Sequence, residues 1–94
     1  PAEQVEHPPV VVSRVVPAYP SLARAQGLEG LDVLRVIIDR GGGVEPAIVV
    51  TRSLAGLDEA AVAALRRWRF DPGRDHDGQP VRVVLEVPMR FQLR

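Results

Sequence analysis

The alternating run Val81–Leu93 constrains the fold of this chain more than any other feature. Its polar side carries Arg82, Glu86, Arg90 and Gln92, and its apolar side carries Val81, Val83, Leu85, Val87, Met89, Phe91 and Leu93. A two-residue period of this kind predicts a long β-strand with one face on a hydrophobic core. Pro88 interrupts the run and has no N–H to offer a neighbouring strand, so we expect an edge strand or a bulge there.

Two earlier segments predict an antiparallel hairpin. Leu31–Ile38 is rich in β-branched residues, and Val44–Arg52 is the expected returning strand. The turn between them, Asp39–Gly43, ends in three consecutive glycines, which adopt positive φ without steric cost.

Two helices are expected, one before the hairpin in the sequence and one after it. The first opens at Pro20 or Ser21 and runs through Gln26, with Gly27 as a left-handed cap. The second spans Leu57–Trp68. Its apolar stripe consists of Leu57, Ala61, Leu65 and Trp68, with Asp58 and Glu59 in its first turn and Arg66, Arg67 and Arg69 at its last. The order predicts an α+β fold: a three-stranded antiparallel sheet with two helices packed on one face.

The length of 94 residues predicts one domain. Residues 1–13 are expected to be the end of a proline-containing linker or an extended arm, and residues 14–94 the folded domain. Val10–Val16 is too short to assign by period and predicts a weak strand or an arm. The absence of cysteine excludes a disulfide framework, and the 12 basic and 12 acidic residues balance, so the charge gives no reason to bind nucleic acid.

Enzyme and metal-site motifs are not evident. Asp75-His76-Asp77 are three adjacent loop residues, which rarely converge on one ion. Gly41-Gly42-Gly43 lacks the Gly-Lys-Ser/Thr ending of a phosphate loop. The basic and aromatic run Arg66–Phe70 is better explained as a helix end with Trp68 buried than as a nucleic-acid patch. We therefore expect no catalytic residue, no metal ligand, no cofactor and no nucleic-acid partner.

Several motifs in order resemble the C-terminal domain of the TonB family of bacterial energy transducers, from about Arg14 to Leu93. They are Ala18-Tyr19-Pro20 before a short helix, Gly27-Leu28-Glu29-Gly30, Arg66-Arg67-Trp68-Arg69-Phe70 followed by Pro72, and Gly78-Gln79-Pro80-Val81 before a strand that ends in Arg90-Phe91-Gln92-Leu93.

The resemblance implies a non-enzymatic periplasmic domain of an inner-membrane-anchored protein, whose anchor is not in this chain. Its implied partners are TonB-dependent outer-membrane receptors, through their box peptide and plug, and an ExbB/ExbD-type inner-membrane motor, through an N-terminal part. Energy from the proton-motive force would then drive import of siderophores or cofactors. The alternative is a TonB-like protein-binding or dimerisation module of another envelope or signalling protein, and a homodimer is left open.

The resemblance also implies where a receptor would bind. A box peptide would add a strand along Val81 to Val87. The entry segment, which contains Pro17, Tyr19 and Pro20, would lie beside it. The expected partner-binding residues are Arg14, Val16, Pro17, Tyr19, Pro20, Arg24, Val81, Val83, Leu85 and Val87. Val16 replaces a glutamine of well-known members, and Leu22 replaces an arginine, for which Arg24 is the nearest substitute. Tyr19 has two compatible roles, capping the core and meeting a partner.

The resemblance raises one conflict about the sheet. In the first hairpin strand, Asp32, Leu34, Val36 and Ile38 match positions that point toward the helices, which leaves the other face unusually apolar: Leu31, Val33, Ile37, Ile48 and Val50. A solvated sheet face is normally polar. Either something covers this face, the Val10–Val16 arm, a second copy or a partner, or the register is shifted by one residue.

Overall fold

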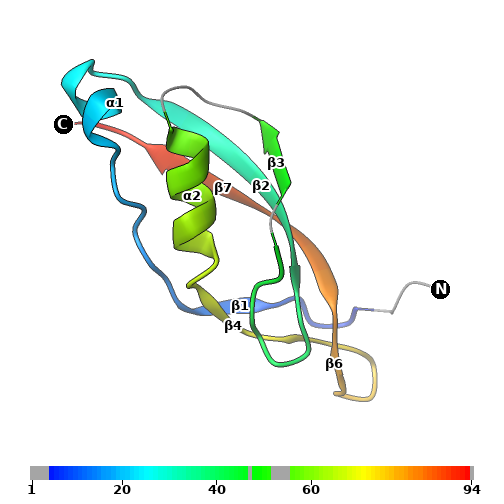
Figure 1. The fold of residues 1–94 in the computed structure, drawn as a ribbon. Helices are drawn as coiled ribbons and strands as arrows, with labels where there is room; N and C mark the ends of the chain where they lie inside the picture. The colour runs from blue at the N-terminus through cyan, green and yellow to red at the C-terminus, as the bar shows by residue number, and fades with distance from the viewer. Residues whose placement is uncertain (1–4, 47, 52–55, 94) are drawn as a thin grey trace.

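A three-stranded antiparallel sheet with strand order β3-β2-β7 organises the fold (Figure 1). The computed structural model describes residues 5–46, 48–51 and 56–93. Its helices are α1 (Ser21–Ala25) and α2 (Leu57–Leu65), and its strands are β1 (Val10–Ser13), β2 (Gly30–Ile38), β3 (Ile48–Thr51), β4 (Arg69–Asp71), β5 (Gly73–Arg74), β6 (Pro80–Val81) and β7 (Val83–Phe91). β7 lies at an edge and pairs with β2 from Gly30 opposite Phe91 to Ile38 opposite Val83 without a break, so Pro88 marks an edge strand, not a bulge.

The core lies between the sheet and the two helices. β2 buries Leu34, Val36 and Ile38, and α2 buries Leu57, Ala61 and Leu65, each at most 1% exposed. Ala23 of α1 joins the same cluster, as do Val87, Met89 and Phe91 of β7. Asp32 is also fully buried on this side. The facing predicted for both long strands is therefore confirmed, and the register is not shifted.

The C-terminal end of α1 is as predicted, and α2 ends earlier than predicted. Gly27 has φ 67°, and the Leu28 N–H donates to the Ala23 carbonyl at 2.9 Å, which closes α1 as predicted. α2 ends at Leu65, three residues before the predicted end, because the chain tightens there into a turn in which the Trp68 N–H donates to the Leu65 carbonyl at 3.0 Å. Trp68 is nevertheless buried at 6% exposure.

The predicted arginines therefore do not lie in the last turn of the helix, which contains no basic residue. Arg69 belongs to β4, and its guanidinium donates to the Trp68 carbonyl at 2.7 Å.

The β2–β3 hairpin turn depends on Asp39. One carboxylate oxygen of Asp39 accepts from the N–H groups of Gly41 and Gly43 at 2.9 and 2.8 Å. Only Gly42 of the three glycines has positive φ, at 86°. β3 begins at Ile48 rather than at Val44, which forms an isolated bridge with Ile38, and the predicted end at Arg52 lies outside the described residues.

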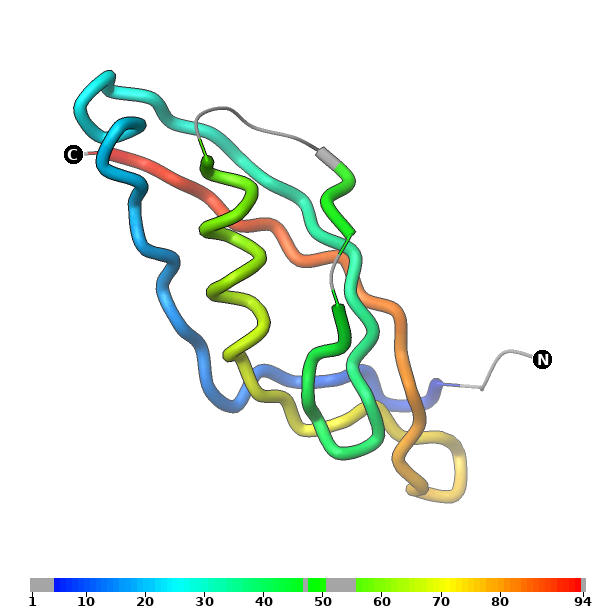
Figure 2. The backbone as a smooth tube through the Cα atoms, viewed as in Figure 1, coloured from blue at the N-terminus to red at the C-terminus, as the bar shows by residue number. Residues whose placement is uncertain are grey.

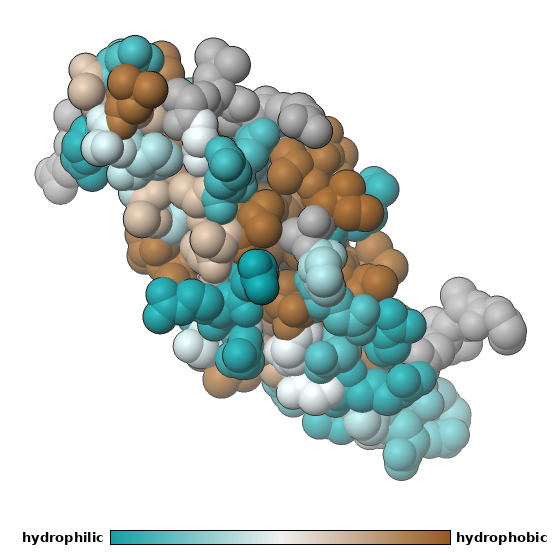
Figure 3. Space-filling view, in the orientation of Figure 1, coloured by the Kyte–Doolittle hydropathy of each residue, from teal (hydrophilic) through white to brown (hydrophobic). Residues whose placement is uncertain are grey.

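Two small two-stranded sheets were not predicted. β1 pairs with β4, so part of the N-terminal arm lies on the domain. β5 pairs with β6 around the loop residues Asp75-His76-Asp77. Figure 2 shows the blue chain between β1 and α1 passing beside α2. In Figure 3, brown side chains gather on the β3 side of α2, and teal side chains cover the end that holds β6.

Candidate functional site

The outer edge of β7 exposes main-chain groups in a definite pattern. The Glu45 N–H donates to the Ile37 carbonyl at 2.9 Å, so Ile37 directs its main chain toward the β3 side of β2. Its partner on β7 is Val84, which therefore belongs to a pair without mutual hydrogen bonds and faces away from β2. Strand alternation gives Glu86, Pro88 and Arg90 the same outward direction. Proline suits this set, because the nitrogen that lacks a hydrogen faces outward.

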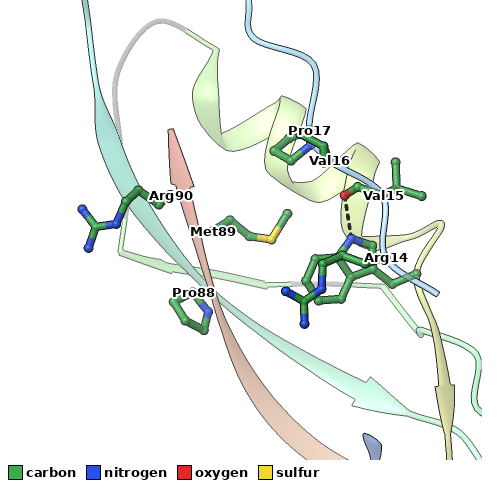
Figure 4. Close-up of a pocket in the computed structure, with 8 residues that line it drawn as sticks. Arg14, Val15, Val16, Pro17, Pro88, Met89 and Arg90 are labelled. Carbon is green, nitrogen blue, oxygen red and sulfur yellow. Dashed lines mark hydrogen bonds between the residues drawn. The ribbon is translucent and has the colours of Figure 1, made fainter. Parts of the chain in front are cut away.

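A recess of about 190 Å³ borders the C-terminal half of this edge. Its lining combines Trp68 with two segments, Arg14–Pro17 of the arm and Pro88–Arg90 of β7. In Figure 4, Met89 projects into the space between the two segments, and Arg90 and Pro88 lie on the far side of β7 from Arg14. The recess is apolar at its base, it has Arg14 on the arm side, and it lies beside an open strand edge.

Trp68 holds the arm in place. Its indole Nε1–H donates to the Val15 carbonyl at 2.8 Å, and the Arg14 guanidinium lies 5.0 Å from the centre of its ring. The pairing of β1 with β4 and a bridge between His7 and Arg74 extend this attachment toward the N-terminus. The wall of the recess is thus fixed by hydrogen bonds and a cation–π contact.

The entry segment after the recess packs on the end of the sheet. The Tyr19 hydroxyl donates to the Leu28 carbonyl, and the Tyr19 ring meets Phe91 edge to face at 5.6 Å between ring centres. The Arg24 guanidinium covers the same ring at 5.2 Å. Tyr19 therefore has the core-capping role, while its ring remains partly exposed.

The structure brings together only part of the predicted site. Arg14, Val16 and Pro17 line the recess opposite Pro88–Arg90, not opposite Val81–Val87. Val16 is 83% exposed. The remaining entry residues, Tyr19, Pro20 and Arg24, do not line this recess.

Val83, Leu85 and Val87 direct their main-chain groups toward β2 and their side chains to the helix side of the sheet. Val81 and Val87 are buried, and Val83 and Leu85 are partly buried on the helix side. Val81 already pairs with Gly73, so the open stretch begins later than predicted. The outward main-chain groups belong to the alternate residues Val84, Glu86 and Arg90. Val84 and Glu86 fall within the predicted stretch Val81 to Val87, and Arg90 lies beyond it.

The other candidate motifs have structural roles. One carboxylate oxygen of Asp75 accepts from the N–H groups of Asp77 and Gln79, both at 2.9 Å, which shapes the β5–β6 turn. Among residues 5–46, 48–51 and 56–93, no three His, Cys, Asp or Glu side chains gather in a way that could hold a metal ion. In the same part of the chain, each helix is too short to cross a membrane.

Comparison with known proteins shows which protein family this chain matches. The family model for the Gram-negative bacterial TonB protein C-terminal region matches residues 15–93. Protein TonB of Vibrio cholerae is 32% identical over 90 residues, which are 95% of this chain and 36% of that protein. Protein tonB2 of Pseudomonas aeruginosa is 37% identical over 78 residues, which are 82% of this chain and 28% of that protein. The chain therefore spans about a third of the length of these relatives.

A solved structure shares the fold. The solution NMR structure of the Pseudomonas aeruginosa TonB C-terminal domain matches with a TM-score of 0.74, covering 92% of this chain and 87% of that one at 23% identity. At this identity the match supports the architecture alone.

Proposed function

Because this chain belongs to the TonB C-terminal family, we propose that it is the periplasmic receptor-docking domain of a TonB-type energy transducer. The observation that carries the proposal is the outward edge of β7 with the recess beside it. The short box peptide of a TonB-dependent outer-membrane receptor would add to this edge as a fourth strand.

The edge supplies the affinity in this proposal. The N–H groups of Val84, Glu86 and Arg90 and the carbonyls of the same residues and Pro88 would pair with the peptide main chain. Alternate peptide side chains would point toward the helix side, where the recess between Arg14–Pro17 and Met89 can receive them. The arm would thus clamp the peptide from the side opposite β7.

The wider role is mechanical and not catalytic. An ExbB/ExbD-type motor in the inner membrane would act on this domain through a preceding linker and anchor. The domain would pass that energy to the receptor plug and permit import of a siderophore or cofactor. The arm is well placed for such transmission, since β1 and Val15 join it to β4 and Trp68, next to the proposed peptide site.

A peptide titration followed by amide NMR tests the docking mode. We expect a receptor box peptide from the same organism to shift the amides of Val84–Arg90 and Arg14–Val16. Val84→Pro removes an outward N–H and should weaken binding by roughly 10- to 100-fold, since a lost main-chain hydrogen bond and the added ring together cost about 1.5–3 kcal/mol.

Two variants serve as controls. Arg82→Ala changes an exposed side chain that pairs with Glu45, and it should change affinity less than about threefold. Gln92→Pro introduces the same residue beyond the end of β7 and tests whether proline alone perturbs the domain. Far-UV circular dichroism confirms folding of each variant. Shifts confined to Gly73–Pro80 and α2, with β7 silent, would exclude this mode.

A further inference from the structure

The face of the sheet opposite the helices, here called the open face, is unusually apolar. Its four most exposed apolar side chains come from all three strands: Ile48 is 65%, Val84 61%, Val50 44% and Leu31 38% exposed. Val33 and Ile37 are partly exposed between them on β2. Side chains of this type cover a few hundred Å², the upper range of what a soluble monomer usually exposes.

The described elements of the chain are placed elsewhere. Both helices contribute to the core on the opposite side of the sheet, where β2 buries Leu34 and Val36. The arm, expected as one candidate cover, pairs with β4 and bonds to Trp68 through Val15. The prediction that the Val10–Val16 arm covers the open face is therefore wrong.

The charges of the open face are complementary to themselves. Arg35 of β2 lies opposite Glu86 of β7, and the two side chains form an ion pair of 2.7 Å while each remains about half exposed. Apolar residues flank this pair on both sides along the strands, with Val33 opposite Pro88 and Ile37 opposite Val84. The face thus carries this pair of opposite charges in an apolar surround, with Arg90, opposite Leu31, toward one end of the face.

From this arrangement we infer that the open face packs against the open face of a second copy of the chain. A two-fold axis that runs along the strands between β2 and β7 places Arg35 of each copy over Glu86 of the other. The same operation stacks Val33 over Pro88 and Ile37 over Val84. Two antiparallel sheets pack face to face in this aligned manner, about 10 Å apart.

The small size of the face predicts a weak dimer. Two patches of a few hundred Å² bury less than the roughly 1,600 Å² of a standard interface, so we expect association near millimolar concentration and not at low micromolar concentration. This association becomes significant where the local concentration is high. The outer edge of β7 remains open in the dimer, so the dimer and the strand-addition site are compatible and can be tested separately.

Charge reversal provides the test. Arg35→Glu places two like charges in each copy, and so does Glu86→Arg. Homodimers of either variant bring like charges together, while a heterodimer of the two restores both contacts across the two-fold axis. Sedimentation velocity of the 94-residue chain from about 10 μM to 1 mM should show dimers for the wild type and at least about tenfold weaker association for each variant alone. An equimolar mixture of the variants should recover association to within about threefold of the wild type.

Controls keep the outcomes distinct. Leu22→Asp changes a residue of α1 that is 61% exposed and away from the open face, and it should leave association unchanged. Dilution should shift the amides of Leu31–Ile37 and Val84–Arg90 in the wild type. A wild type that stays monomeric at 1 mM, or a mixture that associates no better than the single variants, would overturn the inference. The same holds if a different protein binds this face while the chain itself remains monomeric. A box-peptide titration on the same samples reports on the docking site independently.

Discussion

Replacing Trp68 with alanine tests how the core and the arm are joined. The side chain is 6% exposed, its ring centre lies 6.2 Å from that of Phe70, and its indole donates to the Val15 carbonyl at 2.8 Å. Truncating a buried tryptophan costs about 3–5 kcal/mol. A domain of this size has a total stability of about 5–15 kcal/mol, so we expect Tm to fall by roughly 15–30 °C.

Thermal unfolding followed by far-UV circular dichroism measures this change without relying on tryptophan fluorescence. Trp68→Phe keeps most of the ring volume and removes the hydrogen bond, so it should cost about 1–2 kcal/mol and speed amide exchange in Val10–Ser13. Leu22→Ala, on an exposed side of α1, should stay within about 0.5 kcal/mol of the wild type. A Tm for Trp68→Ala within about 5 °C of the wild type would refute the proposed role of this side chain.

Two further substitutions probe the frame around the site. Gly42→Ala should destabilise the domain by at least about 2 kcal/mol in urea unfolding, because Gly42 has φ 86° and an added Cβ would meet the Phe70 main chain. A change near zero would mean that the hairpin turn is not in close contact with β4. Tyr19→Phe removes the hydroxyl that donates to Leu28 and keeps the ring on Phe91, so it should lower the unfolding free energy by about 1 kcal/mol while leaving peptide affinity unchanged; a large loss of affinity with intact stability would assign the hydroxyl to the partner instead.

The sequence predicted the elements whose signal comes from burial. The alternation from Val81 onward and the apolar stripe that ends in Trp68 each indicate which face of the segment is buried. The burial of Leu34, Val36 and Ile38 was implied by the family resemblance and is confirmed. The apolar face had left a register shift of one residue open, and the burial pattern of β2 excludes that shift.

Long-range contacts set the remaining features. β4, β5 and β6 are two or three residues long, too short to show a period. β4 pairs with β1 near the other end of the chain, while β5 and β6 pair with each other across a short turn. The recess depends on a hydrogen bond between Trp68 and Val15, which are separated by 53 positions. The hydrogen bond between Ile37 and Glu45 shows that the main-chain groups of Val84 point away from β2. Main-chain groups alternate in direction along a strand, and side-chain polarity does not specify which residues point outward.

Amide hydrogen exchange along β7 tests the central claim most directly. In the free domain, the N–H groups of Val83, Leu85 and Val87 should be protected by β2, while those of Val84, Glu86 and Arg90 should exchange quickly. Saturating box peptide should slow exchange at Val84, Glu86 and Arg90 by about tenfold or more and leave the alternate amides nearly unchanged. Unchanged exchange at these three amides in the presence of bound peptide would contradict strand addition at this edge.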